Sequence, residues 1–169
     1  MKTARYVAAA VVALTIGVGA YLSLEPDRLR QMPPSVAYTL LDGTPSSTDA
    51  LRGKVVLVNF WATSCTTCVH EMPQIVATHE RFKARGFETL AVAMSYDPPA
   101  AVARFAQDRK LPFSVVIDNT GAVARSFGKV RLTPTTLLIN KRGEIVERYV
   151  GEPDFAALNK LVDRLLSEG

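Results

Sequence analysis

Residues 54–72 read KVVLVNFWATSCTTCVHEM, and this stretch decides the fold class. Its first seven residues form an almost unbroken apolar run, which predicts a strand buried on both faces of a mostly parallel sheet. Apolar side chains then recur at helical spacing, so we expect a helix over residues 65–85. A strand therefore leads directly into a helix, and Cys65 and Cys68 lie at the junction.

The rest of the chain alternates between strand and helix. The turn dipeptide Asp42-Gly43 predicts a small hairpin within residues 36–49. The last helix should begin at Asp154, which has the side chain of an N-cap. Further strands are expected at 87–94, 113–117, 135–139 and 145–150, and further helices at 99–109, 120–127 and 154–166. The pattern predicts an α/β fold in which helices flank a mixed sheet with an antiparallel edge.

Composition and charge exclude several classes of protein. The chain has 169 residues, 48% hydrophobic and 21% charged, which fits one globular domain and excludes a disordered or fibrous protein. Half of the net charge of +4 comes from residues 1–30, and the remainder holds 16 bases against 14 acids. No basic run with interleaved aromatic residues occurs, so we expect no nucleic-acid partner.

The N-terminus has the pattern of a membrane-targeting segment. Lys2 and Arg5 precede eighteen residues without a charge, which as a helix would span ~27 Å, close to the hydrocarbon thickness of a bilayer. By the positive-inside rule the rest of the chain would then lie beyond the membrane. Cleavage after Ala20 would instead release a soluble exported domain. The expected parts are a single-pass signal anchor, a linker and a domain, over residues 1–24, 25–34 and 35–169.

The two cysteines form a Cys-x-x-Cys motif at the start of the expected helix. Unpaired backbone N–H groups and the helix dipole favour a thiolate there, so the pKa of a thiol at this position should fall below its usual value. The i, i+3 spacing brings both sulfurs to one side of the first turn, close enough for a disulfide. We expect Cys65 to be the exposed nucleophile and Cys68 the buried resolving thiol.

Other uses of the motif have less support. A structural zinc site needs four ligands, and the chain has no second cysteine pair. Haem attachment needs a histidine directly after the second cysteine, where Val69 stands. We therefore expect redox chemistry with no metal and no cofactor. His70 should lie on the outer face of the helix, and His79 should be a partly buried structural residue in its apolar stripe.

The stretch from Val58 to Cys68, followed by Glu71-Met72-Pro73, resembles the active-site segment of membrane-anchored thioredoxin-like proteins of the TlpA/ResA type. The resemblance covers about residues 34–167. It implies a thioredoxin-like fold with an N-terminal hairpin and a central insertion over residues 97–114, preceded by the membrane helix.

The resemblance also assigns roles to residues outside the motif. Thr133-Pro134 matches a dipeptide that such proteins hold in the cis form beside the two sulfurs. Because Pro134 has no N–H, it can face Cys65 while the backbone of Thr133 stays free to pair with an extended substrate. Trp61 would pack beside the motif. Trp61, Thr133 and Pro134 are accordingly expected to be substrate-binding residues.

Three departures from the pattern bear on the chemistry. Thioredoxin has a buried aspartate where this chain has Asn59, and an asparagine cannot accept a proton at neutral pH. A carboxylate from elsewhere, or water, must therefore help to deprotonate the resolving thiol. Ser64 replaces a tryptophan usual in the family, and Thr66-Thr67 lacks the proline common between the cysteines.

The implied function is that of an exported thiol–disulfide oxidoreductase at the bacterial inner membrane, with its domain in the periplasm. The resemblance implies reduction of disulfides in extracytoplasmic client proteins, such as apocytochromes or copper-centre assembly proteins. It also implies recharging by a membrane thiol-transfer protein. A general oxidant would need more positive charge around its thiolate than this stretch offers.

Two other classes remain as alternatives. A copper-handling module of the SCO kind could bind Cu(I) through both cysteines and a histidine. That family spaces its cysteines by three residues and has a histidine far downstream, whereas this chain has none after His79. A thiol peroxidase would have a threonine three residues before the reactive cysteine, where Ala62 precedes Cys65.

Overall fold

The computed structural model describes residues 33 and 35–168. The expected membrane segment at 1–24 lies outside the described residues, and so does the linker at 25–34 apart from Pro33. Among the described residues, no helix has the length and apolar character needed to cross a membrane. The anchor, the linker and the domain boundaries stay predictions.

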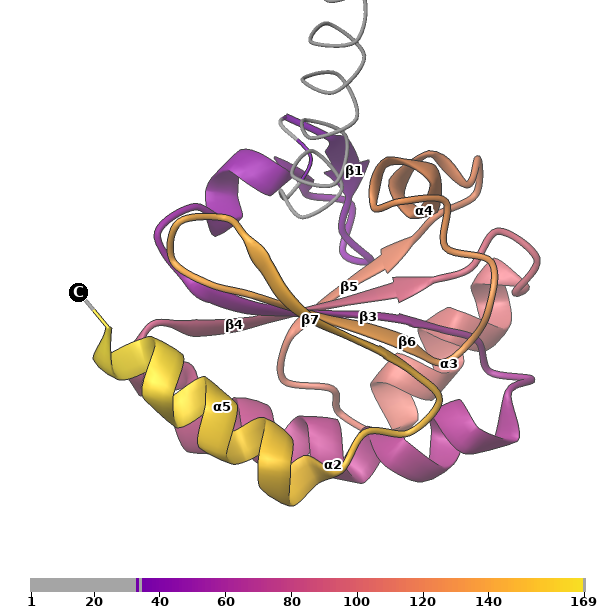
Figure 1. Cartoon of the computed structure of the whole chain (residues 1–169). Coiled ribbons are helices and arrows are strands. Elements are labelled where there is room, and N and C mark those ends of the chain that lie inside the picture. The colour runs from indigo at the N-terminus through magenta and orange to yellow at the C-terminus, as the bar shows by residue number, and fades with distance from the viewer. Residues whose placement is uncertain (1–32, 34, 169) are drawn as a thin grey trace, which may run out of the picture. The chain divides into compact units, whose positions relative to one another are not determined.

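A five-stranded mixed sheet forms the centre of the fold (Figure 1). Its strands are, in spatial order, β5 (Ser114–Ile117), β4 (Phe87–Ala93), β3 (Val55–Trp61), β6 (Thr135–Ile139) and β7 (Ile145–Val150). β3, β4 and β5 are parallel, β6 is antiparallel to β3, and β7 is antiparallel to β6. All seven residues of β3 are buried, as expected of a strand covered on both faces. The expected mixed sheet is confirmed.

Helices cover both faces of the sheet. One face carries α2 (Thr66–Phe82), α3 (Pro99–Asp108) and α5 (Phe155–Ser167), and the other carries α4 (Ala122–Ser126) (Figure 1). The helix expected over 65–85 ends earlier, because a 3-10 turn, η2 (Lys83–Arg85), follows it and Gly86 takes a left-handed conformation. The expected cap of α5 is confirmed, since the Asp154 carboxylate accepts hydrogen bonds from two backbone N–H groups of its first turn.

A small hairpin of β1 (Ala37–Thr39) and β2 (Pro45–Ser47) precedes the sheet, as expected. The Leu41 N–H donates to the Val115 carbonyl at 2.8 Å, so the chain after β1 lies along the outer edge of β5. A second 3-10 turn, η1 (Thr48–Leu51), follows β2 and has no clear signal in the sequence pattern. Among the described strands, β7 forms the other edge of the sheet.

The sheet separates two apolar layers. The layer beneath α2, α3 and α5 contains Trp61, Cys68 and Met72, and Cys65 packs at its border. The layer on the α4 side contains Phe60 and Phe127, whose ring centroids lie 5.8 Å apart. The cysteine motif therefore straddles the boundary between the core under α2 and the surface.

Candidate active site

Cys65 and Cys68 are joined by a disulfide, with their Cα atoms 5.2 Å apart. Cys65 is the N-cap of α2, and its Sγ accepts a hydrogen bond from the Cys68 N–H at 3.2 Å. The expected position of the motif at a helix N-terminus is therefore confirmed. Cys68 is completely buried, whereas Cys65 is partly exposed, so only the first cysteine is accessible from solvent.

A buried carboxylate anchors the loop between β3 and the cysteines. Asp97, in the loop after β4, accepts a hydrogen bond from the Thr63 N–H at 2.6 Å and another from the Thr63 hydroxyl at 2.5 Å. Asp97 is almost completely buried. Because Thr63 lies two residues before Cys65, these two bonds restrain the approach of the chain to the reactive sulfur.

The Thr133–Pro134 peptide bond is cis, as expected. Phe60 pairs with Thr135 across β3 and β6, so Pro134 lies at the end of β3 from which the chain enters the cysteine loop. Figure 1 shows the α4–β6 connection and the β3–α2 junction at the same end of the sheet. Within the described residues, the main-chain N–H and C=O of Thr133 have no hydrogen-bond partner. They are therefore available to pair with an extended segment.

Trp61 is completely buried and packs on Phe105 with ring centroids 5.0 Å apart. Its indole N–H has no hydrogen-bond partner within the described part of the chain. The side chain thus supports the cysteine loop from the core beneath it. Contact of Trp61 with a substrate stays a prediction.

The structure adds a buried residue, Glu71, that the sequence-based site did not include. The Asn59 side-chain amide donates to Oε1 of Glu71 at 2.9 Å and also to the Thr136 hydroxyl at 2.9 Å. Oε2 of Glu71 has no partner among the described residues. Burial raises the pKa of the Glu71 carboxyl to about 7, although the hydrogen bond from Asn59 opposes this shift.

Glu71 lies three residues after Cys68 on α2, so both side chains project from the same face of the helix toward β3. The Asn59 amide on the strand thus holds a carboxyl that the helix supplies. The sequence did contain a signal for it. Glu71 falls on the inward stripe of α2, where an acidic residue is unusual.

The two histidines lie on opposite sides of α2. His70 is exposed, as expected, and its Nδ1 lies 3.0 Å from Oε2 of Glu152. His79 is more deeply buried than the sequence indicates, with its Nδ1 3.1 Å from the Thr89 hydroxyl. Burial lowers the pKa of His79, which fits a neutral structural residue.

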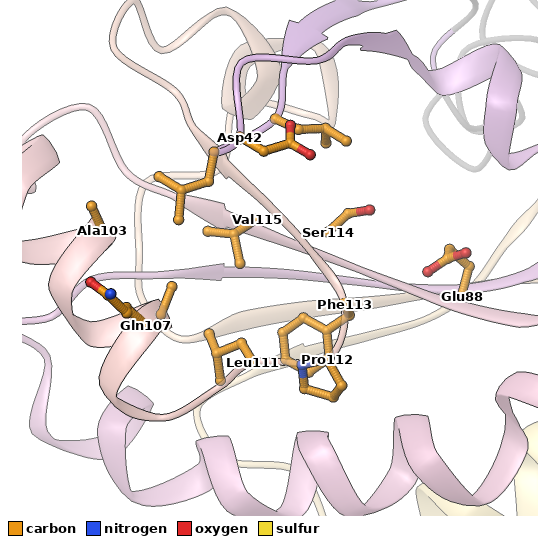
Figure 2. Close-up of a pocket in the computed structure, with 12 residues that line it drawn as sticks. Asp42, Glu88, Ala103, Gln107, Leu111, Pro112, Phe113, Ser114 and Val115 are labelled. Atoms are coloured by element: carbon orange, nitrogen blue, oxygen red, sulfur yellow. The ribbon is translucent and has the colours of Figure 1, made fainter.

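A separate pocket of about 520 Å³ lies between α3, the start of β5 and the chain after β1. Figure 2 shows Leu111 and Phe113 on its apolar wall and the carboxylates of Asp42 and Glu88 at its border. Glu88 pairs with Val56 at the beginning of β3, whereas the cysteines follow the end of that strand. The pocket contains neither cysteine, and its Glu88 border lies toward the opposite end of β3 from them.

The chain is similar to known proteins over most of its length. The Redoxin family matches residues 30–162. Thiol-disulfide oxidoreductase ResA from Halalkalibacterium halodurans is 36% identical over 146 residues, which cover 84% of this chain and 82% of that protein. ResA from Geobacillus kaustophilus is also 36% identical, over 118 residues that cover 70% and 67% of the two chains.

Solved structures show the same likeness. A Neisseria meningitidis protein assigned as a thioredoxin has a TM-score of 0.75 and 42% identity, covering 80% of this chain and 90% of its own. A thiol:disulfide interchange protein of the thioredoxin family from Chlorobium tepidum has a TM-score of 0.73 and 28% identity, covering 82% and 98%. The expected thioredoxin-like fold class is confirmed.

Proposed function

The chain belongs to the Redoxin family as a thiol–disulfide oxidoreductase of the TlpA/ResA type, and we propose that it reduces the disulfides of client proteins through Cys65 and Cys68. One observation carries the proposal. An accessible sulfur at a helix N-terminus is bonded to a buried sulfur, and a buried carboxyl lies one helical turn beyond it, with one oxygen that has no partner in the described part of the chain. This arrangement can hold two electrons and can also move a proton.

The reaction begins with the reduced pair. The Cys65 thiolate attacks one sulfur of the client disulfide, which forms a mixed disulfide and releases the first client thiolate. The Cys68 thiol then gives its proton to the Glu71 carboxylate and attacks Sγ of Cys65. The second client thiolate leaves, and the Cys65–Cys68 disulfide forms. Two electrons pass to the client, and a carboxyl with a pKa of about 7 is suited to the proton transfer at neutral pH.

Reduction is the direction that the charges around the motif support. A strong oxidant stabilises its reduced thiolate with nearby positive charge. Here the neighbour of Cys68 on the inner face of α2 is the carboxyl of Glu71. The cationic candidate on α2 beside the cysteines, His70, is exposed and pairs with Glu152. The start of α2 itself therefore gives the thiolate little cationic support.

We also propose a membrane location and a class of client proteins for this chain. Residues 1–24 would anchor the chain in the bacterial inner membrane with the domain in the periplasm, or would be cleaved to leave the domain soluble there. Clients would be exported proteins with disulfides, of the cytochrome c maturation or copper-centre assembly type. A membrane thiol-transfer protein would return electrons to Cys65 and Cys68. The similarity to ResA proteins supports these assignments.

A redox titration tests the direction. The full chain in nonionic detergent is equilibrated with glutathione buffers, and the oxidised fraction is measured by alkylation. A reductase should have a potential more reducing than that of the glutathione couple. A potential well above that couple would make the protein an oxidant. Tight Cu(I) binding without any disulfide exchange would favour the copper-handling alternative.

A further inference from the structure

Large hydrophobic side chains gather on the surface beside the cis peptide bond. Tyr96, Leu132 and Val150 are 57%, 64% and 59% exposed, and they are three of the four large hydrophobic residues exposed in the described part of the chain. Leu132 directly precedes Thr133, and the Tyr96 hydroxyl lies 3.1 Å from the Thr133 hydroxyl. Exposed apolar side chains therefore lie beside Thr133, the residue whose backbone is free to pair.

Val150, on the edge strand β7, lies at the same patch. It pairs with Thr135 across β6 and β7. The next residue, Gly151, donates its N–H to the Pro134 carbonyl at 2.9 Å. The apolar patch of Tyr96, Leu132 and Val150 thus draws on the β4–α3 loop, the α4–β6 loop and β7. Clustered exposed hydrophobic residues mark a binding surface more often than isolated ones do.

Basic side chains border this patch. Lys129 and Arg131 are exposed in the loop that leads to the cis bond. The Arg148 guanidinium approaches that loop, since its Nη1 lies 3.4 Å from the position of a Cβ at Gly128. None of these three side chains has an ion pair within residues 35–168. Their charge is therefore uncompensated by the described part of the protein.

The acidic groups nearby are engaged elsewhere. No Asp or Glu occurs between Asp118 and Glu144 in the sequence. Asp118 accepts hydrogen bonds from two N–H groups at the start of α4, Asp97 binds Thr63, and Glu152 pairs with His70.

Glu147, next to Arg148 on β7, lies on the other face of the sheet. Arg148 pairs with Leu137, which belongs to the layer on the α4 side. Glu147 pairs with Leu138, which belongs to the layer under α2. Its carboxylate therefore does not neutralise the basic border formed by Lys129, Arg131 and Arg148.

We propose that this surface selects clients, by docking an extended segment that carries an apolar side chain close to its reactive cysteine and Asp or Glu residues beside it. The inference rests on the proposed reductase function and adds a substrate class to it. When an apolar client side chain covers the apolar patch, both lose contact with water, and this stabilises the complex. The basic border attracts acidic residues and raises the rate of encounter.

The test compares peptide disulfides that differ only in charge. Three peptides of one length share an apolar residue next to the cystine, and their flanking positions hold Asp, Asn or Lys. The reduced full chain, in nonionic detergent, should reduce the Asp peptide between about twofold and tenfold faster than the Asn peptide at low salt. The Lys peptide should be slowest. The differences should shrink at 0.5 M salt, because salt screens exposed charges.

A double variant identifies the residues responsible. Lys129→Gln with Arg131→Gln should bring the ratio of Asp-peptide to Asn-peptide rates close to one. Lys160→Gln with Arg164→Gln removes the same charge from exposed positions on α5, across the sheet, and should leave the ratio as in the wild type. Leu132→Ser should slow the reduction of all three peptides.

Each outcome has a distinct meaning. Equal rates for the three peptides, with bis(2-hydroxyethyl) disulfide still reduced by the wild type, would overturn the docking surface and leave the reductase function intact. Failure to reduce that small disulfide and every peptide would overturn the function and the docking surface together. If the Lys129/Arg131 variant kept the peptide ratio but lost binding to phosphatidylglycerol vesicles, the surface would be a lipid-binding face and the proposal would be wrong.

Discussion

The side-chain amide of Asn59 donates a 2.9 Å hydrogen bond to Oε1 of Glu71, and both residues are completely buried. The bond joins β3 to α2 and orients the carboxyl, while Oε2 has no partner among the described residues. A carboxyl with a pKa of about 7 changes its protonation state at neutral pH. From the Asn59–Glu71 pair we therefore make two predictions, one about the rate of mixed-disulfide resolution and one about the stability of the fold.

The first prediction concerns the proton that leaves Cys68. Glu71→Gln keeps the shape of the side chain but removes the base, so resolution of the mixed disulfide should slow by about 10²-fold at pH 7.5. The wild-type rate should rise as pH increases through about 7, and the variant should lack this rise. Rapid-quench kinetics of a preformed mixed disulfide measures the step. Glu80→Gln, at an exposed position of the same helix, is the control and should match the wild type.

The second prediction concerns stability in the oxidised protein. The pKa of Glu71 rises from its ordinary 4.5 to about 7, so between these pH values the folded state keeps a proton that the unfolded chain releases. The free energy of unfolding should thus fall as pH rises through this window, by on the order of 3 kcal/mol in all. Glu71→Gln should remove that fall. Urea denaturation at pH 5 and pH 8 tests this, and identical pH profiles of variant and wild type would contradict it.

The roles of the two cysteines are tested by trapping. Cys68→Ser leaves the exposed Cys65 able to attack a client but removes the resolving thiol, so mixed disulfides should accumulate as reducible bands on a non-reducing gel. Cys65→Ser should trap far fewer clients, because Cys68 is buried. In the reduced wild type, Cys65 should also be alkylated before Cys68. Preferential trapping by Cys65→Ser would reverse the assignment.

The hydrogen bonds between Asp97 and Thr63 anchor the cysteine loop, and their removal should lower the stability of the protein in two steps. Thr63→Val removes one of the two hydrogen bonds to Asp97, and Asp97→Ala removes both. Thermal or urea unfolding should show losses of about 1.5 kcal/mol and about 3 kcal/mol, because each of these hydrogen bonds to a buried carboxyl group contributes about 1.5 kcal/mol. Peptide reduction should slow in the same order as the loop loses its restraint. Asp108→Ala, exposed at the end of α3, should change neither quantity.

The topology of the chain is a further prediction. A reporter that is active only in the cytoplasm, fused after Gly169, should be silent, because Lys2 and Arg5 hold the N-terminus inside. The protein should sediment with membranes. An active reporter would contradict the orientation, and release into the soluble periplasm would show that the segment is cleaved near Ala20.

Contacts between distant parts of the sequence explain what could not be predicted. Glu71 bonds to a strand residue twelve positions away, and Asp97 bonds to Thr63 thirty-four positions away. Sequence periodicity assigns a residue to a face of its own helix or strand, but it does not say which side chain from another element will meet it. The sequence shows that an acidic residue, Glu71, lies on the inward stripe of α2. It does not show that Asn59 on β3 is the partner of this residue.

The sequence by itself determined the features that depend on neighbouring residues: the apolar strand β3, the start of α2 directly after Cys65, the disulfide spacing of Cys65 and Cys68, and the cap of α5. Local spacing sets these because strand and helix periods act over a few residues. Only the tertiary structure decided that Glu71 is buried against Asn59 and that basic residues from the α4–β6 loop and β7 border one apolar patch. The physical reason is that burial, and with it a shifted pKa or an unpaired charge, depends on every element packed around a side chain.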